Sequence, residues 1–159
     1  MEGNKILKLI AAILLCQGAG IAGSFFNIAS IPTWYTTINR PFFNPPNWIF
    51  APVWTTLFVL MGISLYLVWA KGFKEGKIKT AMTIFGIQLG LNVLWSALFF
   101  GLQSPMLAFI EIVILWAAIY LTIAKFKEIS KTAALLLVPY LFWVSFAAVL
   151  NLSIWLLNF

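Results

Sequence analysis

Several residue types that carry chemistry in proteins are scarce or missing in this chain. It has no histidine, a single cysteine (Cys16), and only four acidic residues among 159. Without histidine, the chain lacks the commonest metal and haem ligand and the commonest general base. The sequence also has no paired carboxylates, no nucleophile–base arrangement and no glycine-rich phosphate loop. We therefore expect no catalytic residues, no metal site and no obligatory cofactor.

Charge is scarce as well. Charged residues make up 9% of the chain and hydrophobic residues 63%, whereas about 25% of an ordinary soluble domain is charged. This composition places the chain in a lipid membrane. The formal net charge is +6, but the lysines lie in short segments between apolar runs, where they orient membrane helices. No basic patch alternates with aromatic residues, so nucleic acid is not an expected partner.

Long apolar runs dominate the rest of the chain. Each of five runs is long enough to cross a bilayer as a helix. The sequence predicts one all-α membrane domain over residues 1–159, with helices at about 9–29, 47–70, 80–100, 106–124 and 132–157. Pro139 is expected to kink the fifth helix, because proline lacks an N–H group.

The first apolar run has a second interpretation, as a cleaved signal peptide. Lys5 and Lys8 would form its basic start, and Gly18-Ala19-Gly20 its cleavage site. The apolar character continues beyond this site through Phe25 and Phe26. That continuation favours a spanning helix, in which the small residues permit close packing.

The positions of the charges predict the orientation of the bundle. Lysines cluster at the N-terminus, between the second and third runs, and between the fourth and fifth. With five spans, these segments fall on one side of the membrane, and Arg40 lies on the other. Because positively charged loops stay in the cytoplasm, we expect a cytoplasmic N-terminus and an external C-terminus.

Residues 30–46 connect the first two runs on the predicted outer side. Pro32, Pro41, Pro45 and Pro46 lie in this segment, and fixed φ angles and missing N–H groups oppose regular helix or central strand there. The sequence predicts a stiff loop over this segment. Asn47, an acceptable helix cap, is expected to start the next helix.

Aromatic and polar residues recur at helical spacing on three runs. Trp54 and Phe58 lie one turn apart on the second. The third and fifth each have a face of polar and aromatic residues: Gln88, Asn92, Trp95 and Phe99 on one, and Tyr140, Trp143, Ala147 and Asn151 on the other. Two interpretations remain open. The faces line an inward cavity, or their polar groups bond to one another around a filled core.

Two charged residues are further candidates for polar contacts. Glu111 is the acid that lies inside a predicted span, where a carboxylate is costly unless it is neutral or paired. Arg40 could pair with it or meet an anionic ligand. Equally, a protonated Glu111 could bond within the bundle and Arg40 could lie among lipid headgroups.

The third run also contains a Gly-x-x-x-Gly motif at Gly86 and Gly90, with Ala97 and Gly101 repeating the small-residue spacing. Small residues four apart let helix backbones approach closely in lipid. We expect a homodimer through Gly86, Gly90 and Ala97, although the same spacing also serves packing within one subunit.

These motifs together resemble the TspO/MBR family of tryptophan-rich sensory proteins, which includes the mitochondrial translocator protein, or peripheral benzodiazepine receptor. The resemblance rests on Trp34-Tyr35, Pro41 and Pro45-Pro46, then Trp54, Phe58 and Met61-Gly62, then Gln88-Leu-Gly-Leu-Asn92 with Trp95-Ser96 and Phe99-Phe100, and finally Pro139-Tyr-Leu-Phe-Trp143 with Phe146-Ala147 and Asn151. It extends from the first predicted helix to the C-terminus.

The resemblance implies a five-helix bundle, usually dimeric, whose outer half holds a pocket closed by the loop between the first two helices. It implies binding of porphyrins and related tetrapyrroles in a prokaryotic plasma membrane. Carried over by position, the ligand-binding residues would be Tyr35, Pro45, Trp54, Phe58, Asn92, Trp95, Phe99, Trp143 and Ala147. The candidates for polar contacts, chosen from the residues themselves, are Arg40, Gln88, Glu111 and Asn151.

Three functions compete on this basis. A receptor or binding protein for tetrapyrroles is the first, and because histidine is missing, a metal-free porphyrin suits it better than haem. Light-dependent porphyrin breakdown, attributed to relatives, is the second. A small-molecule transporter is the third, although no polar path crosses all depths. The sterol motif proposed in animal relatives needs a tyrosine followed by a basic residue, and neither occurs in the last span.

Overall fold

The computed structural model of the protein describes residues 2–72 and 76–159. Within these residues, five helical segments are long and apolar enough to cross a membrane: Gly3–Ser30, Asn47–Trp69, Gly76–Gly101, Pro105–Lys127 and Lys131–Leu157. No strand occurs in the described ranges. The predicted all-α bundle is thus confirmed. Its elements are α1 (Glu2–Ser30), α2 (Trp34–Thr37), α3 (Asn47–Trp69), α4 (Gly76–Ser96), the π-helix η1 (Ala97–Gly101), α5 (Pro105–Lys127), α6 (Lys131–Leu136) and α7 (Val138–Leu157).

The helices form a closed ring of neighbouring pairs. α1 packs against α3 and α4, α4 packs against α5, and α5 packs against α6 and α7. Contact between α3 and α6 completes the ring, and there the Ser64 hydroxyl donates to the Ala133 carbonyl oxygen (2.7 Å). α1 and α3 approach closely because Gly62 has no side chain: a Cβ at this position would lie 2.5 Å from the Ile13 Cα.

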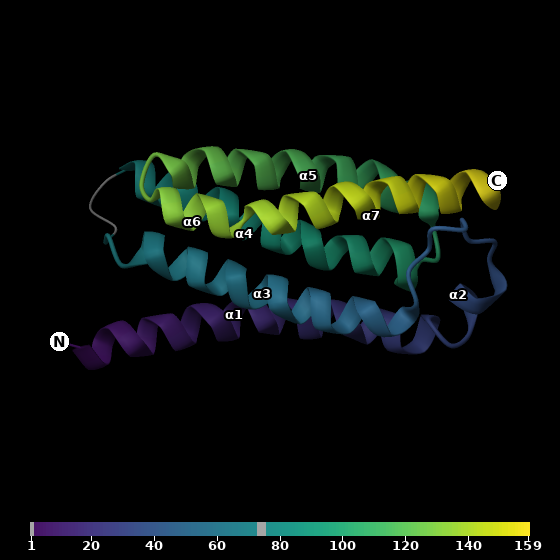
Figure 1. The fold of residues 1–159 in the computed structure, drawn as a ribbon, viewed down its shortest axis with the longest axis horizontal. Coiled ribbons are helices and arrows are strands. Elements are labelled where there is room, and N and C mark those ends of the chain that lie inside the picture. The colour runs from purple at the N-terminus through teal and green to yellow at the C-terminus, as the bar shows by residue number, and fades with distance from the viewer. Residues whose placement is uncertain (1, 73–75) are drawn as a thin grey trace.

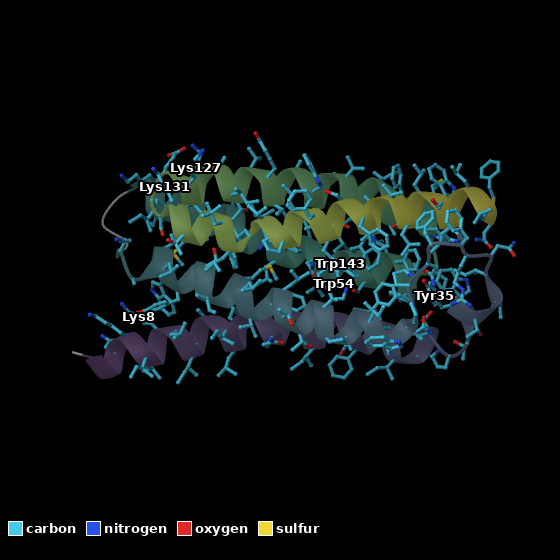
Figure 2. All side chains as sticks on the ribbon, viewed as in Figure 1. Lys8, Tyr35, Trp54, Lys127, Lys131 and Trp143 are labelled. Atoms are coloured by element: carbon cyan, nitrogen blue, oxygen red, sulfur yellow. The ribbon has the colours of Figure 1, made fainter. Side chains whose placement is uncertain are left out.

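The two ends of the bundle differ in character. Figure 2 shows Lys8, Lys127 and Lys131 at the end that holds the N-terminus, and Tyr35 at the opposite end. We call these the lysine end and the lid end. α2 and the C-terminus both lie at the lid end (Figure 1). The arrangement agrees with the predicted sorting of charge, and the orientation in a membrane stays a prediction.

Local sequence explains most helix boundaries. The Ser104 hydroxyl accepts from the Leu107 N–H (3.4 Å) at the start of α5, where Pro105 occupies the first turn. The Ser130 hydroxyl caps α6 in the same way. The last span divides at Leu137 into α6 and α7, two residues before Pro139, because proline cannot donate the helical hydrogen bond.

Three features differ from the sequence prediction. α1 begins at Glu2 rather than near residue 9, since the basic first turns continue the helix. The proline-rich loop contains a one-turn helix, α2, in the proline-free stretch between Pro32 and Pro41. Asn47 is the first residue of α3 and makes no side-chain capping bond; Pro46 holds the cap position instead.

A π-helix ends the third span. In η1 the N–H of Leu102 donates to the Ala97 carbonyl oxygen (2.8 Å), five residues earlier. The wider turn changes which side chains face the bundle. Phe99 is buried there, and its ring stacks on Trp95 with a centroid separation of 5.1 Å.

Candidate ligand-binding site

A cavity of about 430 Å³ lies in the lid half of the bundle. Ligand pockets in proteins span about 300–1,000 Å³, so this space is large enough for a small molecule. Its walls come from α1, the lid, α3, α4 with η1, and α7. Aromatic rings connect α3 to α7 along its wall: Trp54 contacts Tyr140 and Phe50 contacts Trp143, with centroids 6.2 and 6.0 Å apart.

The structure gathers most of the predicted ligand-binding residues around this cavity. Those that line it are Tyr35, Trp54, Phe58, Asn92, Trp95, Phe99, Trp143 and Ala147. Pro45 is not among the lining residues of the described chain; its carbonyl oxygen accepts from Asn44 in the lid. Trp54 and Trp143 extend from α3 and α7, with Tyr35 nearer the lid end (Figure 2).

Flat aromatic surfaces make up much of the wall. Trp54 stacks on Phe58 at 5.7 Å and 29°, and Trp95 stacks on Phe99 at 20°. Trp143 packs against Phe146 at 5.5 Å. Stacked rings present large faces whose π-systems favour contact with another aromatic plane. The wall therefore suits a planar apolar ligand.

Polar groups on the wall bond across the bundle. Asn92 Nδ2 donates to the Tyr140 hydroxyl (2.9 Å), and Trp95 Nε1 donates to Asn151 Oδ1 (3.0 Å). Asn151 Nδ2 in turn donates to the carbonyl oxygen of Pro105 (2.8 Å). The two interpretations of these residues are thus compatible, because the amides link the helices while a cavity remains between them.

Two buried polar atoms on the wall have no hydrogen-bond partner among the described residues: Trp143 Nε1, a donor, and Asn27 Oδ1, an acceptor. Both residues line the cavity, from α7 and α1. Buried polar atoms are normally paired.

The other predicted polar contacts lie in different places. Asn151 lines the cavity, whereas Arg40, Gln88 and Glu111 are not among its lining residues within the described ranges. Gln88 is fully buried, with Nε2 4.0 Å from Met61 Sδ. Glu111 is 5% exposed, and neither carboxyl oxygen has a hydrogen-bond partner in the described part of the chain.

Arg40 belongs to the lid, where its guanidinium lies over the Tyr35 ring, 5.2 Å from the centroid. The Tyr35 hydroxyl donates to Asn44 Oδ1 (2.7 Å). Burial raises the pKa of Tyr35 above its ordinary value, and Arg40 and Asn44 oppose that shift. The phenol therefore stays a neutral donor at physiological pH.

The sequence analysis missed the wall that α1 supplies. Gln17, Gly20, Ser24 and Asn27 all line the cavity, and they recur at spacings of three, four and three, which is helical periodicity. Only small residues of this run were assigned a role, in close packing, and the polar side chains of this face were not recognised. Exposed residues such as Ile28 (70%) also line the cavity, so it extends to the bundle surface between α1 and α3.

The residues predicted for a dimer contact lie on a separate face. Gly86 and Gly90 are exposed, and a Cβ on either would meet nothing within 4 Å. With Gly18 and Ala19 of α1, they line a surface groove. Ala97 is half-buried at the start of η1.

Comparison with known proteins identifies the fold family. The model of the TspO/MBR family matches residues 12–156. The chain belongs to this family. A tryptophan-rich protein TspO of Archaeoglobus fulgidus is 51% identical over 155 residues, covering 97% of this chain and 99% of the relative.

Two more distant TspO/MBR relatives extend the comparison. The translocator protein of Homo sapiens is 36% identical over 124 residues, covering 77% of this chain and 73% of its own. The tryptophan-rich sensory protein of Cereibacter sphaeroides is 34% identical over 125 residues, covering 79% and 77%. The family match includes every residue that lines the cavity. The protein is therefore an integral membrane protein of the TspO/MBR family.

Proposed function

We propose that the protein binds porphyrins and related planar tetrapyrroles in the lid-half cavity, and that it acts in their sensing, transport or stress regulation. The observation that supports this most strongly is the convergence of Trp54, Trp95 and Trp143, from three spans, on one cavity. Indole faces can stack on a macrocycle. The proline-rich lid is largely preformed, so ordering it on binding costs little entropy.

Family membership supports a sensing or carrying role. Relatives are named as a sensory protein and as a translocator protein. An archaeal relative at 51% identity supports a prokaryotic plasma membrane as the location that we propose. Porphyrin carboxylates directed toward the lid would face Arg40, which lies against the lining residue Tyr35. Protoporphyrin without iron is the simplest ligand, because the chain has no histidine.

Tryptophan fluorescence tests the proposal. Protoporphyrin added to the protein in nanodiscs should quench emission saturably. Trp54→Ala and Trp143→Ala should each weaken binding about tenfold, the usual cost of truncating a buried aromatic contact. Trp116→Ala is the matched control: it also removes one indole, but from an exposed site outside the cavity lining. Non-saturable quenching, or equal losses in all three variants, would reject the proposal.

Light-dependent porphyrin breakdown is the second candidate. Trp54 and Trp143 line the cavity, so a photosensitiser bound there would lie beside oxidisable indoles. Turnover of many porphyrins per protein in controlled light, abolished by Trp143→Phe, would identify an enzyme. A single event that damages the protein would identify incidental photochemistry.

A further inference from the structure

The lid, residues 31–46, is attached to the bundle in two different ways. Aromatic rings make one attachment: Trp34 contacts Phe99, Tyr35 contacts Phe100, and Phe43 contacts Phe146, with centroids 5.5–6.4 Å apart. Hydrogen bonds make the other. Within the described residues, the bonds that join the lid to α7 all run between Asn39 and the helix end at Leu157 and Asn158.

The Asn158 carboxamide pairs with both backbone groups of Asn39. Its Oδ1 accepts from the Asn39 N–H (2.9 Å), and its Nδ2 donates to the Asn39 carbonyl oxygen (2.8 Å). In an antiparallel β-sheet, a residue on the neighbouring strand bonds to the N–H and the C=O of its partner in the same reciprocal way. A third, longer bond runs from Asn39 Nδ2 to the Leu157 carbonyl oxygen (3.3 Å).

The pair lies where it can control access to the cavity. Asn39 lies near the middle of the lid, far from both chain connections to α1 and α3. α7, whose C-cap residue is Asn158, contributes Ala147, Leu150 and Asn151 to the cavity wall. Asn158 Nδ2 also donates to the Ile154 carbonyl oxygen (2.7 Å), which fixes the carboxamide on the last turn. The pair thus holds the lid across the lid end of the cavity.

Both asparagines are exposed, so water competes for their hydrogen bonds and the pairing can open and close. We propose that Asn39 and Asn158 form a latch that keeps the lid closed over the cavity and whose opening admits solutes from the aqueous side. The inference goes beyond the proposed function. It rests on the cavity and the lid, and not on the identity of the ligand.

A cysteine reporter tests the latch without any ligand. Cys16 is the chain's one cysteine, so Cys16→Ala with Ala147→Cys places a single thiol on the cavity wall. With the protein in nanodiscs, lipid covers the opening between α1 and α3, so a positively charged methanethiosulfonate reagent in water must reach this thiol past the lid. Adding Asn158→Ala should raise the modification rate about tenfold, equivalent to about 1.4 kcal/mol of lost closing free energy.

The two halves of the latch predict unequal effects. Asn158→Ala removes both bonds to the Asn39 backbone, whereas Asn39→Ala keeps that backbone and removes only the 3.3 Å bond. Asn39→Ala should therefore raise the rate less. Asn158→Asp keeps the acceptor and loses the donor, so it should fall between the two. If Asn158→Ala fails to fold, Asn158→Asp tests the latch in its place.

Ser153→Ala is the matched control at the same end of α7. Its hydroxyl bonds to the Val149 carbonyl oxygen and not to the lid, so the rate should not change. An equal rise in this control would show helix fraying and overturn the proposal. So would unchanged rates in all latch variants. If protoporphyrin binds, Asn158→Ala should speed association and dissociation together; if it does not bind, the thiol result still stands.

Discussion

The bond between Asn92 and Tyr140 shows how single polar atoms position the cavity wall. It crosses from α4 to α7, and Asn92 is 7% exposed while Tyr140 is fully buried. Water cannot easily replace a partner at this depth. The loss of either group would leave the other unsatisfied, which costs more than an ordinary hydrogen bond contributes.

Tyr140→Phe removes the acceptor for Asn92 Nδ2 and keeps the ring. We expect the free energy of unfolding in detergent to fall by about 1–2 kcal/mol, measured by titration with a denaturing detergent. Tyr120→Phe is the control, because Tyr120 is 55% exposed and has no such bond in the described residues. Equal destabilisation by the two variants would contradict this account.

Among the helices, α1 and α3 depend on one close approach. Beside the short distance at Gly62, Gln17 Nε2 donates to the Thr55 carbonyl oxygen (3.0 Å), which links the same pair nearer the cavity. These two contacts hold α1 against α3 between the lysine end and the cavity. Beyond them, toward the lid end, the cavity-lining residues of α1 face the aromatic residues of α3.

Gly62→Ala should disrupt this helix pair. The new Cβ would lie 2.5 Å from the Ile13 Cα and 3.0 Å from its nitrogen, and backbone atoms cannot move aside as a flexible side chain can. We expect a loss of about 1–3 kcal/mol in the free energy of unfolding. Gly18→Ala, whose Cβ would meet nothing within 4 Å, should leave stability unchanged or slightly improve it. Thermal unfolding in detergent measures both.

For the whole molecule, we propose that two copies pair through the exposed glycines of α4, Gly86 and Gly90. Gly86→Leu should convert a dimer into a monomer that keeps its fold, because the side chain enters open space in the isolated chain. Light scattering coupled to size-exclusion chromatography measures the mass. Ala117→Leu adds the same bulk to an exposed position of α5 and should leave the mass unchanged. Persistence of a dimer in Gly86→Leu would exclude this contact.

The charge distribution predicts how the molecule lies in the membrane. In a Cys16→Ala background, Phe42→Cys marks the lid, since Phe42 is 100% exposed. Lys127→Cys marks the lysine end (Figure 2). A membrane-impermeant thiol reagent applied to intact cells should label position 42 and leave position 127 unlabelled. The reverse pattern would mean an inverted orientation.

The amino-acid sequence by itself determined the helices and their chemically distinct faces. Hydropathy over about 20 residues defines a span, and helical spacing places Trp95 with Phe99, or Trp143 with Ala147, on one side. These properties are local, so they are visible before folding. The break before Pro139 follows from one missing N–H group for the same reason.

Only the tertiary structure decided whether the polar-aromatic faces enclose a cavity or a filled core, because that depends on how the volumes of separate helices fit together. It also decided which polar groups meet. Asn39 and Asn158 are 119 residues apart in the chain, yet the backbone nitrogen of Asn39 lies 2.9 Å from Asn158 Oδ1 in the fold. A pairing of that kind leaves no periodic trace in the sequence, since it arises from where the lid and the end of α7 come together.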